Sequence, residues 1–348
     1  MSLSGKITGG GFEHIILPHC GRHRSEVLSG PAFGVDVSLI SLPGGLGLAL
    51  TSDPLSLIPS LGLQESAWLS VHLMANDMAT TGFSPMYAQM VLNLPPWLSE
   101  ADFTTYWNYI HQYCDAIGVA ITGGHTGSIE GQNSTIAGGG TMLLTAPVNE
   151  ILLSHKAKEG NVIIVTKACA LSSSALLAMC FPTTVKNKLG KEVYDQGCEM
   201  FYQTSSLKDA LMAKDAGLNY ITAMHDVTEG GVLGAIYEMA VASGNGVSID
   251  NNLLPIGEAQ QSICNLLGID PRFCIGAGSM IIAARKEHAA DVLQHLAANN
   301  IQATAVGQFT SKVNGYKLLQ NGAETNMPYY SKDPYWDAFF TAYNNGWE

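Results

Sequence analysis

Positive charge is almost missing from the first half of this 348-residue sequence. No Lys or Arg occurs between Ser25 and His155, although ten Asp and Glu residues lie in that stretch. The whole chain is 13% charged and carries a formal net charge of -12, which argues against nucleic acid or an anionic membrane as its main partner. Any of these acids that is buried needs a basic group from elsewhere, a proton, backbone N–H groups or a metal ion.

Paired cysteines, apolar spans and a leader segment are also missing. The seven cysteines are scattered, with no C-x-x-C pair, which fits a reducing compartment better than a disulfide framework or a metal–thiolate site. No apolar run approaches ~18 residues, so we expect no transmembrane helix. The opening "MSLSGKITGG" lacks the apolar segment of a secretory signal peptide. We therefore expect a cytoplasmic protein without a membrane partner.

The chain does contain enough apolar material for two domains of mixed strands and helices. Hydrophobic residues make up 47% of it, and its length suits two domains. We place an N-terminal domain at 1–150 and a C-terminal domain at 151–348, and we assign the fold class α/β (α+β). In the first domain, alternation and turn signals predict strands at 35–42, 46–52, 86–94, 119–124 and 134–146, and helices at 65–81 and 99–117.

The second domain shows the same mixture. Apolar runs predict strands at 161–168, 246–250, 277–284 and 303–309, helices at 172–180, 205–216 and 286–300, and a turn that feeds a helix at 223–244. The aromatic, Asn-rich tail at 325–348 is interpreted only as a packing arm.

The helix predicted at 65–81 contains "HLMANDMATTGFSP" at its end, residues 72–85. Apolar side chains occur on almost every side of this helix, which is typical of a buried helix. It nevertheless carries Asn76 and Asp77. A buried carboxylate is costly unless something positive faces it, so the partner of Asp77 is the first question that the sequence raises.

Two more acids fall at suggestive places in the predicted strands. Asp36 lies in a strand, and Asp53 ends one in "TSDP". Carboxylates without cationic neighbours are hard oxygen ligands that suit Mg²⁺, and strand ends in α/β sheets are favoured ligand positions. The same residues also fit a structural role, in which Asp53 caps a turn before Pro54 and Asp36 accepts backbone N–H bonds.

Two glycine-containing motifs offer further candidate sites. In "HDVTEGG", 225–231, two glycines stand at the start of a predicted apolar helix. Glycines let a ligand approach the backbone closely, and free N–H groups at a helix N-terminus bind phosphate. The alternative is an Asp or Thr N-cap with nothing bound. In "GGHTG", 123–127, between predicted strands, His125 could contact phosphate, ligate a metal or transfer protons, or it could be structural.

Five motifs in one order resemble the aminoimidazole ribonucleotide (AIR) synthetase-like, or PurM-like, superfamily. They are "GVD" at 34–36, "TSDP" at 51–54, "HLMANDMATTGFSP" at 72–85, "GGHTG" at 123–127 and "MHDVTEGGVLGA" at 224–235. The superfamily includes the purine cyclo-ligase, thiamine-monophosphate kinase, selenophosphate synthetase and the hydrogenase maturation factor HypE. The resemblance covers about residues 12–310 and is closest to the HypE-like, AIR synthase-related branch.

The resemblance implies a two-domain PurM-like fold, in which the N-terminal domain dimerises through its sheet into a β-barrel and a C-terminal α/β domain lies alongside. It implies a homodimer that binds ATP and Mg²⁺ between the domains and phosphorylates an oxygen of a small-molecule substrate. Asp36, Asp53 and Asp77 match the family's metal-binding acids, so Asp77 is expected to face Mg²⁺ and phosphates. The other implied site residues are Asn76, Gly123, Gly124, Thr126, Thr228, Gly230 and Gly231 for the cofactor, and His125 and Asp226 for catalysis. Arg22, Arg24 and Lys167 are candidate phosphate contacts.

The sequence departs from the family pattern at three positions. Val35 replaces an acid of HypE-like sequences, which puts one metal position in doubt, and His125 stands where the kinase branch has an acid. HypE proper carries a C-terminal cysteine that is carbamoylated and dehydrated to a thiocyanate, whereas the last cysteine here is Cys274. We therefore do not expect that reaction on this chain's own tail.

Three functions remain open at this stage. The first is an ATP- and Mg²⁺-dependent enzyme that phosphorylates an oxygen of an amide-like or phosphorylated substrate. The second is the purine cyclo-ligase acting on formylglycinamidine ribonucleotide. The third is a non-catalytic, ATP-binding maturation protein that holds a protein partner.

Overall fold

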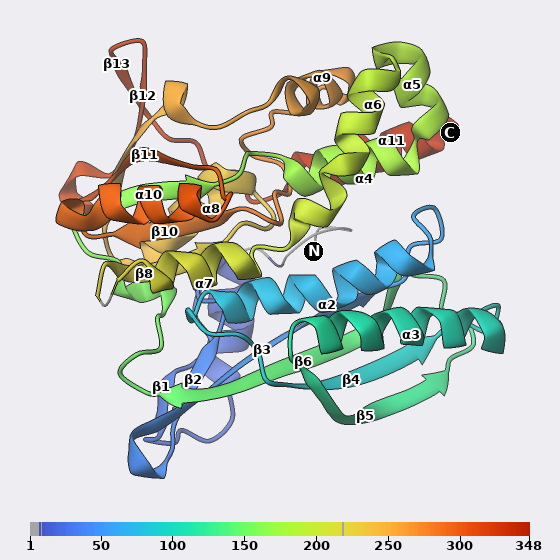
Figure 1. Cartoon of the computed structure of the whole chain (residues 1–348), viewed down its shortest axis with the longest axis horizontal. Helices are drawn as coiled ribbons and strands as arrows, with labels where there is room; N and C mark the ends of the chain where they lie inside the picture. The colour runs from blue at the N-terminus through green and yellow to red at the C-terminus, as the bar shows by residue number, and fades with distance from the viewer. Residues whose placement is uncertain (1–6, 8, 218) are drawn as a thin grey trace.

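The computed structural model describes residues 7, 9–217 and 219–348, and its strands form two separate sheets (Figure 1). The first sheet has six strands in the order β1-β2-β3-β6-β4-β5. These strands are β1 (Val27–Ser29), β2 (Ser38–Ser41), β3 (Leu46–Ser56), β4 (Tyr87–Leu94), β5 (Ala120–Ser128) and β6 (Ile136–Pro147). All neighbouring strands are antiparallel except β4 and β5, which are parallel.

Two long helices, α2 (Leu63–Ala79) and α3 (Glu100–Ala116), cover one face of this sheet (Figure 1). The residues of β4 alternate between exposed and buried, because only the face under the helices is covered. Met90 and Leu92 point into this core, whereas Tyr87 and Val91 are 42% and 43% exposed on the other face. The first sheet therefore presents a partly apolar, uncovered surface.

The second sheet has seven strands in the order β13-β12-β9-β11-β7-β10-β8. The strands are β7 (Val162–Thr166), β8 (Ile221–Asp226), β9 (Gly246–Asp250), β10 (Met280–Ala284), β11 (Ala303–Thr310), β12 (Tyr316–Gln320) and β13 (Ala323–Asn326). Helix α8 (Gly231–Ser243) packs on one face, and α7 (Leu207–Asp215) and α10 (Ala289–Ala298) pack on the other. Because β7, β8 and β10 are covered on both faces, they are buried almost throughout.

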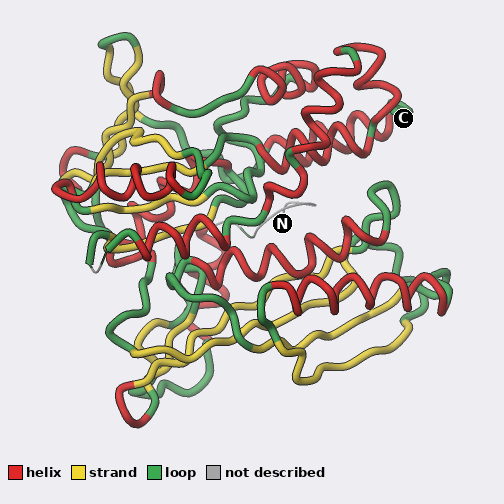
Figure 2. The backbone as a smooth tube through the Cα atoms, viewed as in Figure 1, coloured by secondary structure: helices red, strands yellow, loops and turns green. Residues whose placement is uncertain are grey.

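A group of helices completes the C-terminal half away from both sheets (Figure 2). It consists of α4 (Leu171–Cys180), α5 (Pro182–Leu189), α6 (Lys191–Glu199), α9 (Glu258–Leu267) and α11 (Pro334–Asn344). These helices share one apolar core that includes Phe181, Ile263 and Tyr335. The remaining elements are short: α1 (Gly9–Gly11), η1 (Phe12–Ile16), η2 (Leu17–His19), η3 (Pro43–Gly45), η4 (Ser154–Lys156), η5 (Phe201–Thr204), η6 (Asn251–Leu253), η7 (Lys286–His288) and η8 (Lys312–Asn314).

Most predicted elements exist, and the differences lie at their ends. Ser99 caps α3 as expected, with its hydroxyl accepting the Asp102 N–H at 3.1 Å. The strand that was expected to end at Asp53 continues to Ser56, because β6 pairs with it across Pro54. The "GGHTG" motif lies inside β5 rather than between strands. The expected turn at 223–226 is the end of β8, and the tail contains β13 and α11.

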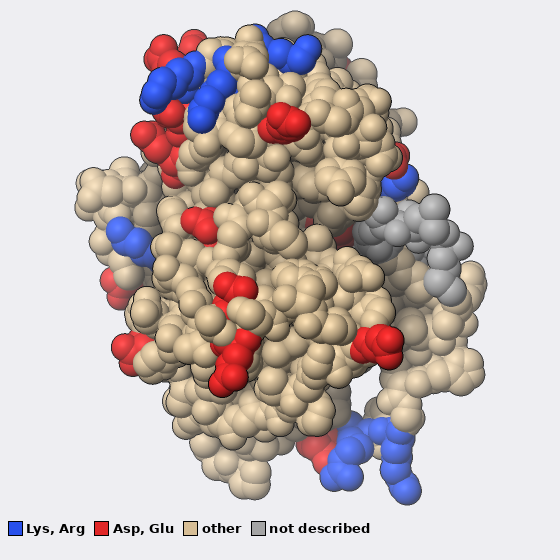
Figure 3. Space-filling view, turned by 90° about the vertical axis from the view of Figure 1, so that its right-hand side faces the viewer, with Lys and Arg blue, Asp and Glu red and all other residues tan. Residues whose placement is uncertain are grey.

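The low content of Lys and Arg in the sequence is visible on the surface of the protein (Figure 3). On the face shown in Figure 3, the middle carries few charged side chains, most of them acidic, and Lys and Arg gather mainly toward its edges. Among the described residues, no helix combines the length and the apolar character needed to cross a bilayer.

Candidate active site

Four aspartates from both halves of the chain converge on one place. Asp53 is in β3, Asp77 is in α2, Asp226 ends β8, and Asp36 lies in the loop before β2. Burial raises the pKa of Asp77 well above its usual range, and the nearby charges of Asp226, Asp53 and Asp36 raise it further. Like charges act in this way only when they are close together. The four carboxylates therefore form one acidic cluster at the junction of the two domains.

A close backbone contact places Asp36 in this cluster. Gly34 lies against helix α8, and a Cβ built on it would be only 2.3 Å from the carbonyl oxygen of Glu238. With φ at 72°, this position also favours glycine over other residues. Gly34 thus lets the N-terminal loop touch the C-terminal domain, two residues before Asp36.

His225 holds Asp36 in position from the other domain. Its Nδ1 lies 2.7 Å from Asp36 Oδ2, and its Nε2 lies 3.4 Å from Glu238 Oε2. Burial alone would lower the pKa of His225, but Asp36 and Glu238 together raise it well above its usual range. An imidazolium between two carboxylates can donate from both ring nitrogens. The Ser154 hydroxyl donates a further hydrogen bond to Asp36 Oδ2 at 3.0 Å.

The donor set of the cluster fits a divalent cation. The carboxylates of Asp36 and Asp226 lie within 4.8 Å of one another, beside the His225 ring. Because both nitrogens of that ring face carboxylates, His225 supports Asp36 and the carboxylates are the candidate ligands. Asp77 receives a hydrogen bond of 2.7 Å from the Thr51 hydroxyl, and its main charged neighbours are the other acids. Carboxylate oxygens that crowd together raise one another's pKa, and a hard cation such as Mg²⁺ relieves that repulsion. The question about the partner of Asp77 is therefore answered in part: acids, not Lys or Arg, dominate its surroundings.

Asn76, the neighbour of Asp77, points elsewhere. Its amide nitrogen donates to the Thr204 carbonyl at 2.9 Å, and its amide oxygen accepts the Ser206 N–H at 2.7 Å. The side chain is fully buried. The structure thus uses Asn76 to join α2 to the C-terminal domain, whereas the sequence had placed it among the nucleotide-binding residues.

The "GGHTG" residues do not reach the acidic cluster within one protomer. They lie on β5, at the sheet edge and three strands away from β3, which is about 14 Å at the usual strand spacing. A Cβ on Gly124 would be 1.7 Å from the Met90 carbonyl oxygen, so strand packing explains this glycine. Gly123 faces open space, and His125 and Thr126 are exposed.

The turn after β8 is also engaged by the protein itself. The Gly230 N–H donates to Asp333 Oδ2 at 2.6 Å. A Cβ on Gly231 would be 2.6 Å from the Arg272 carbonyl oxygen, and the Gly231 N–H faces the Thr228 carbonyl at 3.3 Å. This turn therefore differs from the open phosphate cradle that its sequence suggested, although it positions Asp226 in the cluster.

Of the three basic residues that were candidates for phosphate contacts, Lys167 and Arg24 have partners within the protein and Arg22 is exposed. The Lys167 ammonium donates to the carbonyls of Ser205 and Gly278 at 2.7 and 2.8 Å and pairs with Asp209 at 3.0 Å. The Lys167 ammonium group is thus already bonded to three groups of the protein. Arg24 pairs with Glu26, and Arg22 is exposed.

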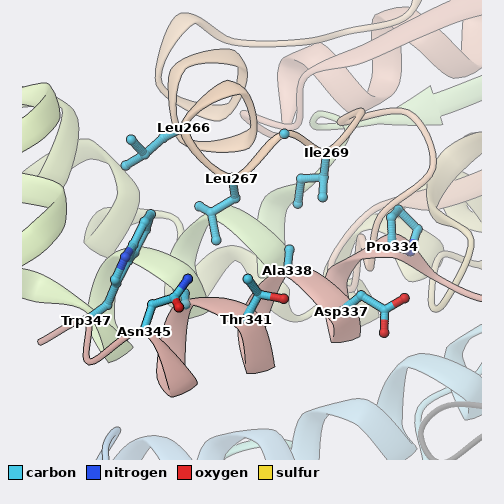
Figure 4. Close-up of a pocket in the computed structure, with 11 residues that line it drawn as sticks. Leu266, Leu267, Ile269, Pro334, Asp337, Ala338, Thr341, Asn345 and Trp347 are labelled. Carbon is cyan, nitrogen blue, oxygen red and sulfur yellow. The ribbon is translucent and has the colours of Figure 1, made fainter.

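A groove of about 430 Å³ lies between α9 and α11, apart from the acidic cluster (Figure 4). Its lining is largely apolar, with Leu266, Leu267 and Trp347 on its sides and Asp337 at its rim. None of the expected site residues contributes to it.

Sequence reasoning gave no role to His225 as a partner of Asp36, nor to Thr51, Ser154 or Glu238. Each acts through a contact between segments far apart in the chain, such as the 2.7 Å contact between His225 and Asp36. The sequence did offer one indication of the role of His225. It directly precedes Asp226 at the end of β8, so a site that contains Asp226 has His225 close by.

Two curated relatives show the likeness in sequence. A hydrogenase expression/formation protein of Methanocaldococcus jannaschii is 27% identical over 243 residues, which cover 66% of this chain and 64% of that protein. The carbamoyl dehydratase HypE of Cupriavidus necator is 23% identical over 250 residues, which cover 71% of this chain and 68% of that protein. The chain thus spans about two thirds of the length of these relatives.

Two solved structures show the likeness in fold. A chain of the HypE–HypF complex superposes with a TM-score of 0.74 at 18% identity, covering 92% of this chain and 100% of that one. A hydrogenase maturation protein HypE in complex with ATP gives a TM-score of 0.67 at 18% identity, covering 94% of this chain and 95% of that one. The mixed two-domain architecture is therefore a PurM-like fold.

The domain matches cover both halves of the chain. Residues 34–143 match the N-terminal domain of AIR synthase related proteins, and residues 158–317 match their C-terminal domain. The first match contains Asp36, Asp53 and Asp77, and the second contains Asp226. On these matches the chain belongs to the AIR synthase-related family.

Proposed function

We propose that this protein is an ATP- and Mg²⁺-dependent enzyme that phosphorylates an oxygen of a small amide-like or phosphorylated substrate. The acidic cluster carries the proposal, because burial and three neighbouring carboxylates raise the pKa of Asp77 at the junction of the two domains. Structural charge clusters usually contain compensating cations. His225, which is bonded to Asp36, supplies positive charge at one side of the cluster.

The residues fit a metal ion in a definite way. Asp53, Asp77 and Asp226 would hold Mg²⁺, and Asp36, oriented by His225 and Ser154, would complete the oxygen set. Bound there, Mg²⁺ would neutralise charge on the transferring phosphoryl group. Thr51 would orient the Asp77 carboxylate through its hydrogen bond of 2.7 Å.

The relatives support ATP use and suggest the substrate class. One relative is a carbamoyl dehydratase, and one structural neighbour was solved with ATP. Dehydration of a carbamoyl group removes its oxygen and both hydrogens of its nitrogen. Phosphorylation by ATP would release ADP and let that oxygen leave as phosphate while the nitrogen loses its two protons. We propose the same class of chemistry here. The HypE–HypF complex shows a protein partner for that HypE, which supports a protein-borne carbamoyl group as a second form of the proposed substrate.

We also propose a homodimer formed through the first sheet. Its uncovered face exposes Tyr87, Val91 and Ile136, and β5 leaves an unpaired edge. A partner protomer on this face would bury these side chains and would lie close to His125, which pairs with Val91 on the neighbouring strand. Light scattering at micromolar protein should give the mass of a dimer, and a monomer would contradict this part of the proposal.

The function is tested by ATP binding and by ADP release. Titration calorimetry should show ATP binding with Mg²⁺ and much weaker binding with EDTA. ADP release should rise with one member of a panel of carbamoyl, purine and thiamine compounds. A folded protein that binds no ATP at millimolar concentration with Mg²⁺ would refute the proposed function.

A further inference from the structure

The tail that follows the second sheet contacts both loops that carry the acids. It begins after β13 and continues into α11, and it lies beyond residue 317, where the family match ends. The contacts come from Tyr329, Asp333 and Trp336. We call the segment 329–336 the strap.

Asp333 forms the shortest of these hydrogen bonds. Its Oδ1 accepts the N–H of Tyr335 at 2.8 Å and thereby caps α11. Its Oδ2 accepts the N–H of Gly230 at 2.6 Å. Gly230 is the N-cap residue of α8 and, as a glycine, has no side chain to cap the helix. Asp333 is only 5% exposed and accepts the N–H of the N-cap residue itself, whereas the Leu233 N–H in the first turn of α8 is accepted by the Arg272 carbonyl at 3.2 Å.

Trp336 and Tyr329 add contacts on either side. The Trp336 indole N–H donates to Glu229 Oε1 at 3.1 Å. The Tyr329 ring stacks on Tyr237, with centroids 4.3 Å apart, and meets the edge of Phe33 at 6.3 Å. The strap therefore holds the 226–231 turn and also the loop that precedes Asp36.

These contacts continue to the acidic cluster. Phe33 is next to Gly34, whose close approach to Glu238 places Asp36 beside His225. Tyr237 is next to Glu238, whose carboxylate faces His225. On the other side, the Gly230 turn directly follows Asp226 and Val227. The strap thus contacts the loop that carries Asp36 in the first domain and the turn that follows Asp226 in the second.

We propose that Asp333 is a positioning residue and that the strap fixes the two acid-bearing loops in the geometry that binds Mg²⁺-ATP. The inference rests on the proposed function for its ligand, whereas the contact itself can be tested without any ligand. Outer partners of metal ligands commonly change affinity or activity by about 10- to 100-fold when they are removed.

The test compares Asp333→Asn with Asp337→Asn. The Gly230 and Tyr335 N–H groups face different oxygens of Asp333. In Asn an NH2 group replaces one of those oxygens, so one of the two N–H groups would face a donor instead of an acceptor. Asp337 is the matched control, because it lies on the same helix, pairs with Lys332 and lines the groove instead of the turn. Trp336→Phe is a second variant that keeps an aromatic ring, although a smaller one, and removes the indole donor.

The first measurement is amide hydrogen exchange of the peptide that spans 226–234, without ligand. Faster exchange is expected in Asp333→Asn and wild-type exchange in Asp337→Asn. The second is calorimetric affinity for Mg²⁺-ATP, which should fall about tenfold in Asp333→Asn, less in Trp336→Phe and not at all in Asp337→Asn.

The outcomes separate the two claims. If the wild type binds no Mg²⁺-ATP, the proposed function fails and the functional role of the strap fails with it. If the wild type binds and both strap variants fold and keep wild-type affinity, only the strap inference is overturned. A lower melting temperature with unchanged affinity would likewise reduce Asp333 to a structural cap and refute the positioning role.

Discussion

Asn76 and Asp77 are neighbours on α2 and have opposite surroundings. Both ends of the Asn76 amide are bonded to the backbone of Thr204 and Ser206. Asp77 faces Asp226, Asp53 and Asp36, with a hydrogen bond from Thr51. A polar group that serves the fold normally has its partners inside the protein. One side of α2 therefore joins the domains, and the other side faces the acidic cluster, where we propose the ligand site.

The joining side of α2 also contains an aromatic group. Trp68 stacks on His72, with centroids 3.7 Å apart, and its indole N–H donates to Thr204 at 2.9 Å. The His72 Nδ1 lies 2.9 Å from the Ser205 hydroxyl. Both side chains therefore contact the segment that Asn76 holds. The predictions below test whether the two sides of α2 differ as this account requires.

The largest loss of stability should come from the joining side. Asn76→Leu leaves the buried Thr204 carbonyl and Ser206 N–H without their partners, and each such group costs about 1–3 kcal/mol. We expect a loss of about 2–4 kcal/mol in the free energy of unfolding, measured in urea. The exposed Asn108→Leu on α3 is the control and should stay within about 0.5 kcal/mol. Equal effects of the two variants would mean that Asn76 does not join the domains.

His72 should make this junction sensitive to acid. Burial lowers the pKa of His72 from 6.5 to about 4. The unfolded chain therefore binds a proton between those values that the folded chain does not, and stability is lost as the pH falls from about 6.5 to 4. The loss amounts to about 3 kcal/mol at most. His72→Gln should flatten the pH dependence of unfolding in this window, and an unchanged slope would contradict a buried neutral His72.

Next to the acidic cluster, Gly34→Ala should displace the backbone that carries Asp36. The new Cβ would lie 2.3 Å from the Glu238 carbonyl oxygen, and we expect a loss of about 1–3 kcal/mol. Asp36 should move from His225, so affinity for Mg²⁺-ATP should fall as well. Gly118→Ala is the control, because Gly118 has φ of 76° and open space around its Cα. If both variants bind Mg²⁺-ATP like the wild type, the Gly34 contact does not support the site.

The smallest effect on stability is expected at the sheet edge. His125 is exposed on β5, so His125→Ala should change the free energy of unfolding by less than about 0.5 kcal/mol. If His125 is catalytic, as its motif predicts, ADP release should fall although stability does not. His111→Ala, on an exposed face of α3, should change neither quantity. Full activity in His125→Ala would remove this residue from the site.

The sequence allowed the acidic side to be predicted better than the joining side. No Lys or Arg occurs between Ser25 and His155, so the sequence alone excluded a basic partner for Asp77 from this stretch. The amide of Asn76 could not be assigned in this way, because its partners lie 128 and 130 residues away. Only the packing of the two domains decides which side of α2 meets the 204–206 segment.

Strand pairing and the tail set two further limits. "GGHTG" is the same pattern whether its glycines make room for a ligand or for a neighbouring strand, and the Met90 carbonyl shows the second reason at Gly124. Similarly, Gly230 resembles an open helix N-terminus until Asp333 is brought to it from 103 residues away. Local patterns indicated which elements form, whereas long-range contacts determine which of their polar groups are already bonded.

The central claim is tested most directly by melting the wild type and Asp77→Asn with ATP, in the presence and absence of Mg²⁺. Asn keeps the shape of Asp77 but removes a buried acid whose ionised form is disfavoured by burial and by the neighbouring acids, so unliganded stability should be equal or higher. Mg²⁺-ATP at a hundredfold excess over Kd should stabilise the wild type by about 2.7 kcal/mol, and the Mg²⁺-dependent part should nearly vanish in Asp77→Asn. Lower unliganded stability with an unchanged Mg²⁺-dependent shift would show that Asp77 serves the fold and would end its assignment to the nucleotide site.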